Sequence, residues 1–269
     1  MEHNYKSVRA LERGLELLME LNVRGRAKPA ELASATGIDR TTVYRMLATL
    51  ADRGLVARSP SEDKYYLLRE IRRLSDGFIE TDEVLHIAAR ELGSMLPQVQ
   101  WPSDFATFDR GAMVIQETTH RFSTLSVHRG MVGRRRPLFT SAMGRAYLAG
   151  ATSQEREMVL DLAEASLQRP VPRNFEALLE DFSKRGYAWS IAGSEPHISA
   201  IAVPIRGLGR ILGSVNIVFF RRVATPEQIA AKHLPRLLTC AEAISRQVNL
   251  SPENTTPKAF DNEESDLPE

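Results

Sequence analysis

The 269-residue chain contains a single cysteine, Cys240, and lacks an apolar run long enough to span a bilayer. One cysteine excludes an intramolecular disulfide and a zinc site built from several thiolates. The N-terminus is too polar for a signal peptide. We therefore expect a protein of the reducing cytoplasm, with no membrane segment.

Excess charge of either sign is also lacking, since the formal net charge is only +1. This balance excludes a chain that binds nucleic acid over its whole surface. The distribution is less even: residues 1–73 hold 14 basic and 10 acidic side chains, and residues 74–269 hold 21 and 24. The positive charge therefore gathers where a DNA-binding domain would place it.

Residues 28–68 carry the most informative pattern. Pro29 and Gly37 are typical of the start and the exit of a short helix, and Asp39 is a favourable N-cap for a second one. Apolar residues recur at helical spacing along this second helix: Val43, Met46, Leu47 and Leu50. Two strand-like runs, 55–58 and 64–68, follow Gly54 around a turn-rich segment. The pattern predicts a winged helix-turn-helix.

The opposite face of the second helix combines short hydroxyl side chains with long hydrogen-bond donors. A helix in the DNA major groove needs both kinds, for phosphates and for base edges. A solvated helix face of ordinary Arg and Thr is the alternative interpretation. The predicted DNA-binding residues are Arg40, Thr41, Thr42, Tyr44, Arg45 and Thr49, with Lys64 on the wing.

Two further helices frame this motif. Residues 6–22 should form a helix that packs under the other two, because Val8, Leu11, Leu15 and Leu18 recur at three and four residues. A helix over 82–96 should bury Leu85, Ala88, Leu92 and Met95 and end at Pro97. We assign residues 1–69 to the DNA-binding domain and 70–96 to a helical linker.

From Trp101 the hydropathy period changes to two. The pattern predicts an α+β domain over 97–250 with a central antiparallel sheet. Gly207–Gly213 reads as a hairpin turn rather than a phosphate loop, because no helix start follows it. The expected strands cover 105–108, 112–117, 124–129, 198–205 and 211–220, and the expected helices cover 142–148, 153–167, 174–186 and 226–247. The acidic residues 251–269 should be disordered.

A characteristic pattern is formed by segments 8–18, 37–45, 137–138, 141–146, 201–205 and 213–216. Through these segments, residues 6–250 resemble the IclR family of bacterial transcriptional regulators. Segments 101–104, 117–123, 128–135 and 232–235 are similar to the branch that activates catabolism of 3-hydroxyphenylpropionate-type aromatic acids, although the loop 191–197 is shorter here. The resemblance implies a GAF-like effector-binding domain, an operator-binding dimer or dimer of dimers, and control of DNA or RNA polymerase by an aromatic carboxylic acid.

Effector-site residues come from two sources. The resemblance places Leu125, His128, Ala142, Met143, Ser190 and Ala200 in the family's pocket. Strand alternation puts Ser214 and Asn216 on one polar sheet face, which could equally be a solvent-facing surface. Trp189 could form an apolar wall of the pocket beside an aromatic ring, and Arg121 and His128 could bind a carboxylate. The basic run 120–136 could instead touch DNA, form subunit ion pairs or be a solvated loop.

Enzymes form the rival function class, with the winged helix as a tether for a domain that turns over a small molecule. Such an enzyme needs an activated nucleophile and its base. The sequence contains no Gly-x-Ser-x-Gly turn, and its six histidines show no spacing typical of metal ligands. We therefore predict a regulator without a catalytic site, metal or cofactor.

Overall fold

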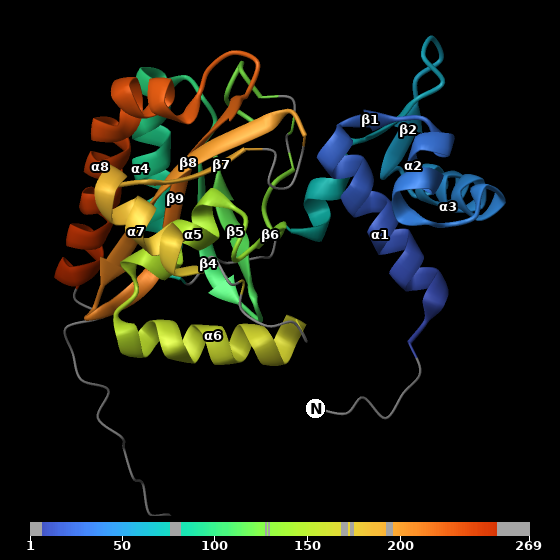
Figure 1. The fold of residues 1–269 in the computed structure, drawn as a ribbon. Helices are drawn as coiled ribbons and strands as arrows, with labels where there is room; N and C mark the ends of the chain where they lie inside the picture. Colours follow the sequence, from blue (N-terminus) through green and yellow to red (C-terminus); the bar gives the residue numbers. More distant parts are fainter. Residues whose placement is uncertain are drawn as a thin grey trace, which may run out of the picture.

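The computed structural model describes residues 7–75, 82–126, 128, 130–167, 172, 175–191 and 196–251 (Figure 1). An N-terminal helix-turn-helix domain is joined to a C-terminal α+β domain, as the sequence predicts. The predicted disordered tail beyond Ser251 and most of the loop 191–197 lie outside the described residues. None of the described helices is both long and apolar enough for a membrane span.

The N-terminal domain contains α1 (Arg9–Arg24), α2 (Pro29–Thr36) and α3 (Arg40–Asp52), followed by the wing. The wing strands β2 (Val56–Arg58) and β3 (Tyr65–Leu67) pair antiparallel, and β1 (Arg26–Ala27), too short for the sequence pattern to reveal, adds to β3. Asp39 caps α3, because its side chain accepts hydrogen bonds from Thr41 N at 2.9 Å and Thr42 N at 3.1 Å. This arrangement confirms the predicted winged helix-turn-helix.

The buried face of α1 differs from the predicted one. Leu17 and Leu21 are fully buried in the core beneath α2 and α3. By contrast Val8, Leu11 and Leu15 are 65, 61 and 46% exposed. The prediction that these three pack under the motif is wrong, because the helix has two apolar faces and the domain core uses the other one. An apolar stripe therefore remains at the surface.

The connection to the C-terminal domain consists of the 3₁₀ helix η1 (Arg69–Leu74) and α4 (Glu83–Val99). Pro97 does not end α4 as predicted; the helix continues to Val99 and closes with Gln100 N donating to Leu96 O. A proline this near the end removes one N–H without breaking the remaining turn. Helix α4 packs with α8 (Pro226–Leu250) on one face of the C-terminal sheet (Figure 1).

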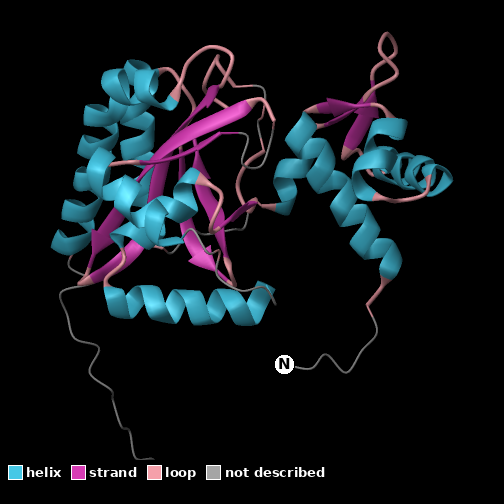
Figure 2. Ribbon diagram, viewed as in Figure 1, coloured by secondary structure: helices cyan, strands magenta, loops and turns pink. Residues whose placement is uncertain are grey.

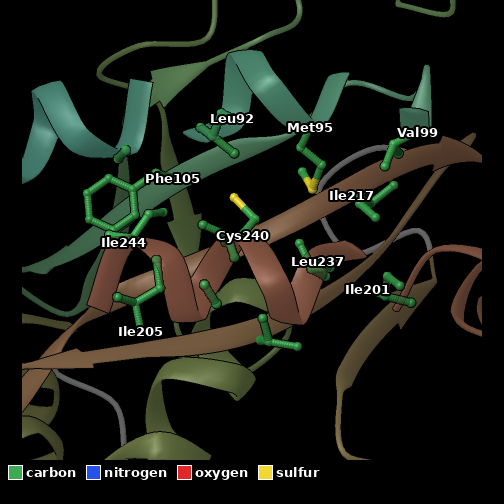
Figure 3. Close-up of a cluster of buried hydrophobic side chains, with 14 of the residues drawn as sticks. Leu92, Met95, Val99, Phe105, Ile201, Ile205, Ile217, Leu237, Cys240 and Ile244 are labelled. Atoms are coloured by element: carbon green, nitrogen blue, oxygen red, sulfur yellow. The ribbon is translucent and has the colours of Figure 1, made fainter. Parts of the chain in front are cut away.

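Six antiparallel strands form the C-terminal sheet in the order β6-β5-β4-β9-β8-β7. Figure 2 shows the strands in magenta with helices around them. Two buried clusters occupy its two faces. The cluster under α4 and α8 contains Phe105, Ile217 and Cys240 (Figure 3), and the other lies beneath α5 (Ala142–Gly150). The strands are β4 (Asp104–Asp109), β5 (Ala112–Thr118), β6 (Arg135–Pro137), β7 (Ala188–Ile191), β8 (Ile198–Gly207) and β9 (Arg210–Phe220).

Two more helices, α6 (Ser153–Leu167) and α7 (Phe175–Arg185), agree with the predicted ranges. Strands β8 and β9 meet at the predicted hairpin turn, where Leu208 and Gly209 take φ of 53° and 72°. The capping box at Thr225 and Gln228 is also confirmed, at the start of α8. The turn places Ser214 and Asn216 on one side of β9, opposite the α8 cluster.

The predicted strand 124–129 is wrong for its described residues, of which none is in a strand; Val127 and Arg129 lie outside them. The third strand of this edge is β6, which pairs Arg136 with Met113. Ser126 instead hydrogen-bonds His120 and the backbone of His128. Such side-chain bonds offer the backbone an alternative to a strand ladder. The described residues of this segment lie beside the sheet as a cover rather than within it.

Candidate functional site

The exposed face of α3 carries the predicted DNA-binding side chains together. Arg40, Thr41, Tyr44, Arg45 and Thr49 are exposed, and Thr42 is half-buried. Val43 and Leu47, fully buried on the opposite side, fix which face points outward. The arrangement leaves a row of donors and hydroxyls accessible to a nucleic acid.

Contacts within α3 hold some of these side chains in place. The Arg40 guanidinium lies 5.8 Å from the centre of the Tyr44 ring, and Thr49 Oγ1 donates to Arg45 O at 3.0 Å. Lys64 lies apart, half-buried on the wing, with its Nζ 3.9 Å from Glu62. Arg58, which the sequence reading passed over, pairs with Asp63 at the same wing tip.

A small cavity of about 50 Å³ lies in the C-terminal domain between the sheet, the start of α5 and the segment 120–136. Six predicted effector residues line it: His128, Ala142, Met143, Ser190, Ala200 and Asn216. Seven further residues line it that the sequence did not single out, three of which belong to the basic run 120–136: Asp104, His120, Met131, Arg136, Ser141, Ile198 and Val218. Leu125 lines a smaller adjoining cavity, which also touches His120 and His128.

Three predicted effector residues lie outside both cavities. The Arg121 guanidinium lies 4.6 Å from the centre of the exposed Phe122 ring. Trp189 Nε1 donates to Asp181 of α7 at 2.8 Å, so its indole serves the α7 contact. Ser214 is fully buried on the cavity side of β9 but is not part of the lining.

The cavity is bounded at one end by the N-terminus of α5. Ser141 caps this helix by accepting from Gly144 N at 3.1 Å, and its hydroxyl donates to Pro137 O at 2.6 Å. The first N–H groups of a helix lack intrahelical partners and carry partial positive charge. Ala142 and Met143 line the cavity at this end, so the helix N-terminus makes it electropositive, and Arg136 is a further lining residue.

The other end is a buried polar network around Asp104. Thr118 Oγ1 donates to Asp104 Oδ1 at 2.7 Å, and Asn216 Nδ2 donates to Oδ2 at 3.1 Å. His120 Nε2 lies 3.6 Å from Oδ1, too far for a hydrogen bond. Burial alone would raise the pKa of Asp104, but the His120 ring and the Thr118 and Asn216 bonds outweigh it and lower that pKa. Asp104 is therefore a carboxylate.

The covering segment also reaches the DNA-binding domain. His128 and Arg136 line a second, open groove of about 480 Å³ together with Glu20, Val23 and Arg24 of α1. Gly130 lies so close to α1 that a β-carbon there would stand 3.1 Å from Asn22 O. One segment thus borders the cavity and touches the helix that supports the DNA-reading face.

A winged helix-turn-helix joined to a domain with an internal cavity is the architecture of one-component DNA-binding regulators, in which one chain carries both domains. Two family models divide the chain between them. The IclR helix-turn-helix domain matches residues 10–60, and the bacterial transcriptional regulator IclR C-terminal domain matches residues 78–246. The chain belongs to the IclR family of bacterial transcriptional regulators.

Its relatives are named regulators. The chain is 26% identical over 258 residues to the glycerol operon regulatory protein of Streptomyces coelicolor, covering 90% of this chain and 97% of that one. It is 23% identical to the p-hydroxybenzoate hydroxylase transcriptional activator of Acinetobacter baylyi, over 90% and 92% of the two chains. The IclR structure of Thermotoga maritima, 21% identical, shares the fold with a TM-score of 0.60 over 90% and 99%.

Proposed function

We propose that this regulator responds to a small aromatic carboxylic acid, which binds in the cavity beside the start of α5. The observation that carries the proposal is the polarity of that cavity: one electropositive end, apolar walls and an anionic opposite end. The relative from Acinetobacter baylyi, named for the activation of p-hydroxybenzoate hydroxylase, supports the same class of effector.

The carboxylate belongs at the electropositive end. A desolvated anion needs a paired cation or several hydrogen-bond donors. Arg136 can supply a guanidinium, and the N–H groups of Ala142 and Met143 can supply the helix-terminus donors that anions favour. Asp104 at the other end repels a second negative charge, so it favours one orientation of the acid.

The ring belongs between the apolar walls, which are formed by Met131, Met143, Ile198, Ala200 and Val218. About 50 Å³ accommodates a few water molecules, whereas ligand pockets usually measure roughly 300–1,000 Å³. Binding therefore requires the described residues between β5 and β6, which carry His120, His128 and Met131, to move outward while β6 keeps Arg136 in the sheet. Because that segment touches α1 through Gly130, the movement shifts the DNA-binding domain as well.

Operator binding calls for a second copy of the chain. The exposed stripe Val8, Leu11, Leu15 and Met19 offers an apolar face on α1 close to α3. Two copies joined through this face would present two recognition helices, and helix-turn-helix dimers read half-sites about 34 Å apart. We infer that the regulator binds a two-fold operator as a dimer or a dimer of dimers.

Calorimetry of the full-length protein with benzoate and 3-phenylpropionate tests the effector class. Both acids should bind, acetate and benzamide should not, and Arg136→Ala should weaken binding about 10-fold or more. Arg222→Ala, which removes an exposed arginine outside the cavity lining, is the matched control. Failure of every aromatic acid to bind, or equal affinity in Arg136→Ala, contradicts the proposal.

A further inference from the structure

Among the residues that the structure describes, one ring nitrogen of the buried His120 has no hydrogen-bond partner. His120 is 3% exposed and lines the cavity. Within the described residues its Nε2 has no hydrogen-bond partner, and the nearest acidic atom is Asp104 Oδ1 at 3.6 Å. A buried polar atom left this way costs free energy, so a group that satisfies it gains affinity.

Hydrogen bonds on the other side of the ring settle which nitrogen carries the proton. His120 Nδ1 lies 2.6 Å from Ser126 Oγ. Ser126 has one hydroxyl hydrogen, and it donates this hydrogen to His128 O at 2.7 Å. Ser126 must therefore accept from His120, so Nδ1 is the protonated nitrogen. In neutral His120, Nε2 is a bare acceptor that faces the Asp104 carboxylate, also an acceptor.

Nε2 becomes a donor when the ring carries a second hydrogen, which is the form of His120 that lowers the pKa of Asp104. In that form the pair offers one donor and one acceptor. A hydroxyl group meets this arrangement with both its functions, because it donates through its hydrogen and accepts through its oxygen. In the neutral state the hydroxyl can still donate to either atom.

We propose that Asp104 and His120 form a subsite that recognises a hydroxyl group on the ring of the effector, so that hydroxylated aromatic acids are preferred to their unhydroxylated analogues. This inference rests on the proposed function. It adds the residues that read the ring substituent, whereas the α5 end reads only the carboxylate.

The sheet register supports a separation of the two ends. Arg136 lies opposite Met113 on β5, and Asp104 lies opposite Thr118. These two positions on β5 are about 17 Å apart along the strand. Arg136 and Asp104 both line the cavity although their strand positions are this far apart. A ligand with a carboxylate at one side of its ring and a hydroxyl at another can contact both.

Calorimetry of the full-length protein with benzoate and its 2-, 3- and 4-hydroxy derivatives tests the subsite. At least one hydroxy isomer should bind about 10- to 100-fold more tightly than benzoate, as expected for a hydrogen bond to a charged group. In Asp104→Asn the ionised acceptor is gone, so the affinity for that isomer and the affinity for benzoate should agree within about twofold. The control Ser199→Ala removes a buried hydroxyl from the α8 side of β8 and should keep the ratio between the two affinities.

The outcomes separate the two proposals. Benzoate binding with no hydroxy isomer preferred overturns the subsite and leaves the effector class standing. A preference that persists in Asp104→Asn also overturns it, since the pair would then have only a structural role. If no acid binds, the proposed function itself fails. Should Asp104→Asn not fold, His120→Gln is measured in its place; it removes the ring that shares the hydroxyl with Asp104, so the preference should fall, and an unchanged preference would overturn the subsite.

Discussion

Replacing Gly144 by alanine should damage the effector site more than its small size suggests. A β-carbon at position 144 would stand 2.5 Å from the carbonyl carbon of Leu138 and closer still to its oxygen. Ordinary contact begins near 3.4 Å, so α5 must move by about 1 Å from the loop after β6. Overpacking of this kind costs about 1–3 kcal/mol, of which the better helix propensity of alanine returns up to about 1 kcal/mol.

The displacement moves the N–H groups of Ala142 and Met143, so the affinity for an aromatic acid should fall at least about 10-fold. Urea unfolding and calorimetry measure the two effects. Gly93→Ala is the matched control, because Gly93 is exposed within α4 and a β-carbon there meets nothing within 4 Å. It should leave stability unchanged or raise it by about 0.5–1 kcal/mol. Equal behaviour of the two variants would refute the close packing of α5 on Leu138.

Three other expectations concern distant parts of the chain. Arg45→Ala should weaken operator binding by about 1–3 kcal/mol in a gel-shift titration if Arg45 reads a base edge, and unchanged affinity in a folded variant would exclude that role. Leu11→Glu should shift the protein toward monomer in sedimentation, because it places a charge on the exposed α1 stripe; an unaltered oligomer would rule out this interface. Burial raises the pKa of Cys240 to about 12, so the native thiol should resist a disulfide reagent at pH 8 and react after denaturation.

Local patterns predicted most elements of the fold. The α6 range, the Asp39 cap and the capping box at Thr225 each follow from residues a few positions apart, whose interactions do not depend on distant strands. The wing could be predicted for the same reason. Strand β6 could not, because Arg135–Pro137 has no apolar alternation and becomes a strand only through its pairing with β5.

Some residues of the candidate site could likewise be predicted from the sequence, and others could not. Ala142 and Met143 were found from a segment that resembles the family, and the structure places both on the cavity lining. Asp104 was missed and His120 was noted only as part of the basic run, since the pairing of β4 with β5 is what brings the two together. Arg136 belongs to the noted basic run, yet sequence alone could not show that Arg136, rather than Arg121, enters the cavity.

The most direct measurement is operator affinity with and without an aromatic acid, in the wild type and in a variant with a filled cavity. Fluorescence anisotropy with a DNA fragment selected by the protein from a random library provides the assay. Ala200→Leu adds bulk to the cavity lining, far from α3. We expect 4-hydroxybenzoate to change wild-type operator affinity about 5-fold or more and to leave that of Ala200→Leu unchanged, with equal affinities in the absence of acid. An equal response of both proteins, or no response of the wild type to any hydroxybenzoate, would contradict the account.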